Sequence, residues 1–188
     1  MVADSWLPEL GPASDSWDRL TERQPEIFDA LAEMQSVFWE LVDPVILELC
    51  RIRMATILGA ERDRELRSGR APAVALEAKV EELPRYTTSP VFSAAERAAV
   101  ALAEQFVLDV KGVTDQQVEA VKEALGAEQC YALVHALQSF EALQRACLVL
   151  GVTPVPATIR ATAEIPESPE NHDNPENHDN PENHDNEV

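Results

Sequence analysis

Residues 43–59 read DPVILELCRIRMATILG, an apolar stretch bracketed by residues that start and stop helices. Asp43 is placed to accept hydrogen bonds from the first free backbone N–H groups, and Pro44 suits the first helical position. Gly59 is placed to end the helix. The apolar residues between them form one broad face: Val45, Ile46, Leu49, Cys50, Ile52, Ala55, Ile57 and Leu58. This pattern predicts a helix that buries most of its surface.

Helical signals continue on both sides of this stretch. Apolar residues recur at intervals of three and four over 25–41, after a proline suited to a first turn. Ser93 with Glu96 and Thr114 with Gln117 have the spacing of capping boxes, which start helices. We expect further helices over 61–70, with Leu66 as its anchor, and over 72–82, 93–110, 114–126 and 128–150. The last has apolar residues around much of its circumference, so we expect it to be central or shared between subunits.

The composition agrees with an all-α fold. The chain has 188 residues, of which 45% are hydrophobic and only 5% aromatic, so alanine, leucine and valine must supply most of the core. A formal net charge of -19 argues against nucleic acid and anionic membrane surfaces as partners. No stretch predicts a membrane span or a basic signal peptide, so we expect a cytoplasmic protein. The three cysteines lie in apolar helical patterns and predict buried, reduced thiols.

Three regions follow one another along the chain. Residues 1–24 contain several helix breakers and predict an irregular arm, residues 25–163 predict the helical domain, and residues 164–188 predict a disordered acidic tail. The tail holds three copies of Pro-Glu-Asn-His-Asp-Asn. Its histidines, His172, His178 and His184, could ligate a metal weakly, but a solvating or docking tail is the favoured interpretation.

The arm contains Asp-Ser-Trp twice, ending at Trp6 and at Trp17. Exposed tryptophans on an arm would suggest docking of a protein partner. The alternative is that the arm folds back on its own domain, and the sequence leaves both open.

Several motifs occur together over residues 41–154. They are Asp43-Pro44, Glu48 through Ala55, Leu83-Pro84, Ser89 through Ser93, Glu96 through Glu104, and Leu150 through Pro154. In this order and spacing the chain resembles the alkylhydroperoxidase D-like branch of the carboxymuconolactone decarboxylase family. The resemblance implies an all-helical bundle that assembles as a homotrimer or homohexamer.

The resemblance also implies a thiol peroxidase site at four positions. In such a site a glutamate precedes a Cys-x-x-Cys pair, and a histidine follows it; the thiolate attacks peroxide, the second cysteine forms the disulfide, and Glu and His move protons. The glutamate position matches Glu48, but the two cysteine positions hold Ala60 and Asp63, and the histidine position holds Arg67. Because alanine, aspartate and arginine cannot replace this chemistry, we expect no thiol-dependent peroxide reduction.

For the other polar residues, a structural role and a role in a functional site are alternative interpretations. Glu48 could transfer protons, but pairing with Arg51 one helical turn later is favoured. Asp63 and Arg67 are spaced for an exposed helical ion pair. His135, the only histidine outside the tail, is expected to be a satisfied interior residue.

Two functions remain open. The preferred one is a catalytically silent oligomer, without a cofactor, that serves as a scaffold or regulator and binds a protein partner through its arm or tail. The alternative is a thiol-independent decarboxylase or lyase acting on a small organic acid in an intersubunit pocket. Glu48, Arg51, Arg53 and His135 would then form the site, with arginines holding the substrate carboxylate.

Overall fold

The chain folds into helices arranged around α3, the helix formed by the stretch that begins at Asp43. The computed structural model describes residues 16–152, and all regular secondary structure within that range is helical, as predicted. The α-helices are α1 Ser16–Arg23, α2 Pro25–Leu41, α3 Pro44–Leu58, α4 Glu61–Glu65, α5 Ala73–Glu82, α6 Ala94–Leu108, α7 Asp115–Leu125 and α8 Ala127–Leu150. Short 3-10 turns follow α5 at Leu83–Arg85 and α6 at Val110–Gly112.

Helix α3 is buried on nearly every side. Its starting cap is the predicted one: Oδ1 of Asp43 accepts hydrogen bonds from the backbone N–H groups of Val45, at 2.7 Å, and Ile46, at 3.4 Å. It ends at Gly59, whose φ of 71° lies in the left-handed region that favours glycine. Between these ends α3 packs against α2, α4, α5, α6 and α8. Its polar side chains must therefore find partners inside the protein.

Both predicted capping boxes are formed. The Ser93 side chain accepts from the backbone of Glu96, while Glu96 accepts from the backbone N–H of Ser93, and Thr114 and Gln117 do the same at the start of α7. These reciprocal bonds set where α6 and α7 begin. Because each capping box joins residues only three positions apart, the start of both helices was predicted correctly from the sequence.

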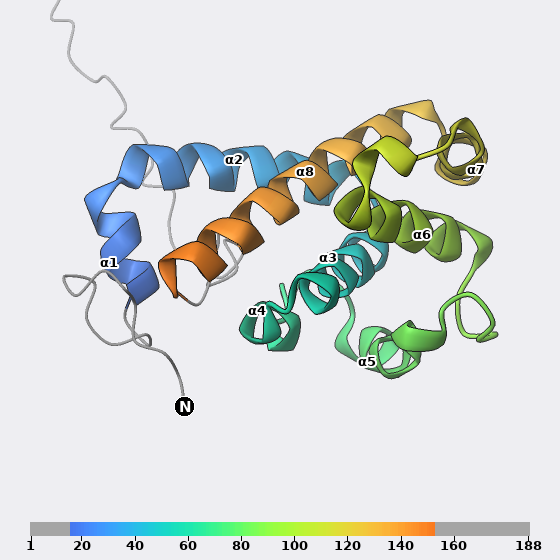
Figure 1. Cartoon of the computed structure of the whole chain (residues 1–188), viewed down its shortest axis with the longest axis horizontal. Coiled ribbons are helices and arrows are strands. Elements are labelled where there is room, and N and C mark those ends of the chain that lie inside the picture. The colour runs from blue at the N-terminus through green and yellow to red at the C-terminus, as the bar shows by residue number, and fades with distance from the viewer. Residues whose placement is uncertain (1–15, 153–188) are drawn as a thin grey trace, which may run out of the picture.

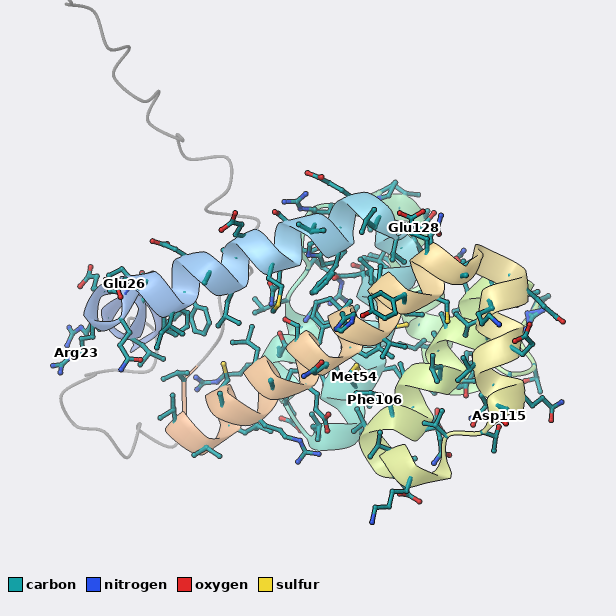
Figure 2. The ribbon with its side chains drawn as sticks, turned by 90° about the horizontal axis from the view of Figure 1, so that it is seen from above. Arg23, Glu26, Met54, Phe106, Asp115 and Glu128 are labelled. Carbon is teal, nitrogen blue, oxygen red and sulfur yellow. The ribbon has the colours of Figure 1, made fainter. Side chains whose placement is uncertain are left out.

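Helix α8 lies between α2 on one side and α3 and α6 on the other (Figure 1). Its inner face is buried in the core, but Tyr131 is 70% and Val149 is 66% exposed. The helix is central, as expected, and still presents one face to the surface. Figure 2 places Arg23 and Glu26 at one end of the molecule and Asp115 and Glu128 at the other. Within residues 16–152, none of the helices has the length and apolarity that crossing a bilayer requires.

The predicted irregular arm is wrong in its second half. Residues 16–23 form α1, and Trp17 is only 6% exposed because its ring packs edge-to-face on Phe28, with the ring centroids 5.1 Å apart. This part of the arm folds back on the domain, so Trp17 is no docking residue. Trp6, the rest of the arm, and the predicted tail with its histidines lie outside the described residues.

The expected helix over 61–70 is also wrong beyond its first turns. Helix α4 ends at Glu65, and Leu66 adopts an extended conformation with ψ of 152°. The segment between Leu66 and Pro72 carries no helix. Its backbone instead supplies hydrogen bonds to buried charged side chains of α3, which a continuing helix could not do.

Candidate functional site

Glu48 and Asp63, two of the four positions that the family resemblance singled out, meet in a buried cluster around Arg51. Arg51 donates from Nε and Nη2 to the two carboxylate oxygens of Glu48, each at 3.0 Å. It donates from Nη1 to Oδ1 of Asp63 at 2.8 Å and to the backbone carbonyl of Asp63 at 2.7 Å. We call Glu48, Arg51, Asp63 and Gln144 the Arg51 cluster.

Every N–H donor of the Arg51 guanidinium is used within the chain. A fifth hydrogen bond runs from Nη2 to the backbone carbonyl of Leu66 at 2.7 Å. Since a guanidinium has five N–H donors, these bonds saturate it. Arg51 therefore has no donor left for a substrate carboxylate in this conformation.

Two further groups complete the cluster. Gln144 of α8 donates from Nε2 to Oδ2 of Asp63 at 2.6 Å and to the backbone carbonyl of Arg51 at 3.0 Å. The backbone N–H of Ser68 donates to Oε1 of Glu48 at 2.8 Å. The cluster thus ties α3 to α4, to the segment after α4 and to α8.

The charged side chains of the Arg51 cluster are buried. Glu48 is fully buried, Arg51 is 7% exposed and Asp63 is 8% exposed. Burial disfavours charge, but the hydrogen bonds and charges of Glu48 and Asp63 outweigh it and raise the pKa of Arg51 above its usual value. Two carboxylates share one guanidinium, so negative charge is in excess. Burial, helped by the nearby Glu48 charge, raises the pKa of Asp63 despite Arg51 and Gln144.

Ala60 and Arg67, the other two positions that the resemblance singled out, do not join this cluster through side-chain bonds. Ala60 is buried and precedes α4 as its capping residue. Arg67 points to the surface and forms an ion pair with Glu77 of α5, Nε to Oε1, at 2.7 Å. The predicted exposed pair between Asp63 and Arg67 is wrong, because α4 ends before Arg67 and Asp63 turns inward to Arg51.

Arg53 and His135 lie apart from the Arg51 cluster. Arg53 pairs with Glu104 of α6 at 2.8 Å and lies over the ring of Tyr86. His135 is exposed on α8 and contacts the ring of Tyr131 edge-to-face, with centroids 4.6 Å apart. The expectation of an interior histidine is wrong, because His135 falls on the exposed face of α8. Within one chain, the four residues of the alternative enzyme site do not converge.

The cysteines are free, buried thiols, as the sequence predicts. Burial raises the pKa of Cys50 and Cys130, and it raises the pKa of Cys147 to about 12, with the Asp63 charge adding to the effect. Because the thiolate is the nucleophile, these three thiols are poor candidates for peroxide chemistry near neutral pH.

Among the described residues, no group of three or more His, Cys, Asp or Glu side chains could hold a metal ion. The tail histidines His172, His178 and His184 fall outside that range.

Sequence reasoning missed Gln144 and the burial of the Glu48–Arg51 pair. Gln144 lies in a long apolar helix, and nothing local distinguishes a glutamine that faces the core from one that faces solvent. A signal for the pair did exist: Glu48 and Arg51 stand inside a helix that is apolar on most sides, which leaves charged residues little access to water.

Compared with protein-family models and with curated proteins, the chain gives no match.

Proposed function

We propose that this chain is a non-catalytic helical oligomer, similar to the alkylhydroperoxidase D-like branch of the carboxymuconolactone decarboxylase family, that serves as a scaffold or regulatory protein. The observation that carries the proposal is the Arg51 cluster. At the positions where a thiol peroxidase has its two cysteines and its histidine, this chain has Ala60, Asp63 and Arg67. Asp63 and the matching glutamate, Glu48, are both bound to the guanidinium of Arg51, which makes five hydrogen bonds inside the protein.

The cluster has the properties of a structural element. Its members come from α3, α4 and α8, and side-chain hydrogen bonds join them in sequence from Glu48 through Arg51 and Asp63 to Gln144. The backbone N–H of Ser68, in the segment after α4, donates to Glu48. Removing one partner from such a buried network leaves an uncompensated charge, so the residues depend on one another for stability. A proton-transfer site instead needs a group that reaches substrate.

The same observation weighs against a thiol-independent enzyme built on these residues. Arg51 has no donor free for a substrate, Arg53 is paired with Glu104, and His135 lies on another face. A pocket using all of them would require the Arg51 cluster to open.

Self-association as a trimer or hexamer is part of the proposal. The surface feature that supports self-association is the apolar outer side of α2, where Val37 is 46% and Leu41 is 40% exposed. Exposed apolar side chains on one helix favour burial against another copy. A protein partner would then bind through the part of the arm before α1 or through the acidic tail. Net charge of -19 argues against nucleic acid and anionic lipid in that role.

The test is a hydroperoxide turnover assay on the full chain with a dithiol donor, alongside measurement of molecular mass in solution. We expect no turnover above the protein-free rate and a mass that is a multiple of the single chain. Steady turnover that Glu48→Gln abolishes and Glu104→Gln preserves would refute the non-catalytic role. A monomeric mass at all concentrations would refute the oligomer.

A further inference from the structure

An apolar groove lies between α8 and the pair α1 and α2, on the side of α8 away from most of α3. Its volume is about 450 Å³, within the range of roughly 300–1,000 Å³ common for small-molecule sites. Helix α1 lies across the end where α2 begins and α8 ends (Figure 1). Residues that line the groove include Trp17, Leu31, Met34, His135, Leu143 and Cys147.

The base of the groove is well formed. Trp17 and Phe28 pack edge-to-face, and Trp17 and Cys147 belong to one buried apolar cluster with Val152. Trp17 is 6% and Cys147 is 5% exposed. Met34 and Ile27, by contrast, line the groove and are 40% and 54% exposed. The groove therefore has a packed floor and an open apolar rim.

One wall of the groove offers hydrogen-bonding groups. His135, Gln138 and Ser139 line it from α8, where their spacing places them on one face. The hydroxyl of Ser139 accepts a hydrogen bond from Nε2 of Gln35 on α2, at 3.3 Å, which fixes its position. Gln24, between α1 and α2, also lines the groove, and the other described lining residues are apolar.

Charge distinguishes the ligands that could enter. Among the described residues that line the groove, none is Asp, Glu, Lys or Arg. The two helices that form its outer wall, α1 and α2, carry six acidic and two basic residues. An anionic ligand would meet this acidic surface and then lose its water in a lining without a charged partner. An uncharged ligand avoids both the repulsion by the acidic surface and the cost of removing water from a charge.

We propose that this groove binds a small, uncharged, apolar molecule that carries one hydrogen-bonding group. The apolar body lies between Trp17, Phe28 and Leu143, and the hydrogen-bonding group meets Gln138 or His135. The inference does not depend on the proposed function, since no member of the Arg51 cluster lines the groove.

A pair of dyes tests both parts of the inference on the full chain. N-phenylnaphthylamine is neutral, and anilinonaphthalene sulfonate has the same rings with an added anionic group. We expect the neutral dye to bind saturably, one molecule per chain, and to change the tryptophan emission of the protein. The sulfonate should bind about tenfold more weakly or not at all, because the lining residues within 16–152 offer its charge no cationic partner.

Two alanine replacements provide the matched variants. Ala142 lies at the groove and is exposed, so Ala142→Trp fills the space without disturbing the core, whereas Ala120→Trp adds the same side chain to an exposed position on α7. We expect Ala142→Trp to weaken binding of the neutral dye about tenfold or more while Ala120→Trp does not. Both variants should keep the wild-type melting temperature within about 3 °C, because exposed positions tolerate substitution.

Several results would overturn the proposal. They are the absence of saturable binding, equal affinity for the two dyes, or unchanged binding by Ala142→Trp. Dye affinity that falls as protein concentration rises would also overturn it, because a second copy of the chain would then be the occupant.

Discussion

The guanidinium of Arg51 donates to both the side chain and the backbone carbonyl of Asp63, a residue twelve positions later on a different helix. Glu48 contacts the same guanidinium from one turn earlier on α3. Glu48 and Asp63 are thus joined through a residue that carries the opposite charge.

Arg51→Met should destabilise the protein strongly. It leaves the carboxylates of Glu48 and Asp63 buried without their cation, and breaking a buried pair in this way costs about 3–5 kcal/mol. Arg53→Met is the matched control, because the pair of Arg53 with Glu104 is partly exposed and should be worth about 1 kcal/mol or less. Urea unfolding of both variants measures the difference. Equal losses would show that Arg51 has no special structural role.

Asp63→Asn should change how stability depends on pH. Because the pKa of Asp63 is raised above the ordinary 3.8, the folded chain holds a proton here that the unfolded chain has released, over the interval between the two values. The contribution of Asp63 to the free energy of unfolding therefore falls as pH rises through that interval. We expect wild type to gain stability relative to Asp63→Asn as pH is lowered towards 3.8. A relative loss on acidification would mean that the pKa is lowered instead.

Glu96 should show the opposite dependence. Burial opposes its charge, but Lys79 and the backbone N–H of Ser93 outweigh this and lower the pKa of Glu96 below 4.5. Its stabilisation is present above pH 4.5 and is lost as pH falls through the lowered value. Glu96→Gln should cost about 1 kcal/mol at neutral pH and less in acid.

The second capping box supplies the control for that experiment. Gln117 caps α7 with the same geometry but carries no charge. Gln117→Ala should therefore destabilise by an amount that pH does not change. Parallel pH profiles for Glu96→Gln and Gln117→Ala would contradict the role given to the Glu96 charge.

The three cysteines should be unreactive in the folded chain. All are buried, and burial raises the pKa of each, that of Cys147 to about 12. A chromogenic disulfide reagent should label them slowly in buffer and rapidly in denaturant. Fast labelling of even one thiol in buffer would identify a reactive cysteine and reopen the question of peroxide chemistry.

The helices could be predicted from sequence because short sequence motifs mark where they begin and end. Asp43 with Pro44, Ser93 with Glu96, and Thr114 with Gln117 are short-range devices, and each forms as expected. Apolar residues that recur at intervals of three and four then predicted the helices between these ends.

The cluster could not be predicted because its contacts are long-range. Asp63 had a plausible local partner in Arg67, and only tertiary structure decides that it bonds to Arg51 and Gln144 instead. The end of α4 at Glu65 has the same cause, since the backbone of Leu66 and Ser68 bonds to the cluster. The exposure of His135 likewise depends on where α8 meets its neighbours.

The most direct test of the central claim is a double-mutant cycle between Glu48 and Arg51, with unfolding free energies measured for wild type, Glu48→Gln, Arg51→Met and the double variant. If the two side chains serve the fold together, their coupling should be about 1–3 kcal/mol, and the double variant should be less destabilised than the sum of the single ones. A coupling below about 0.3 kcal/mol would show that the residues act independently, and the structural account of the cluster would be wrong.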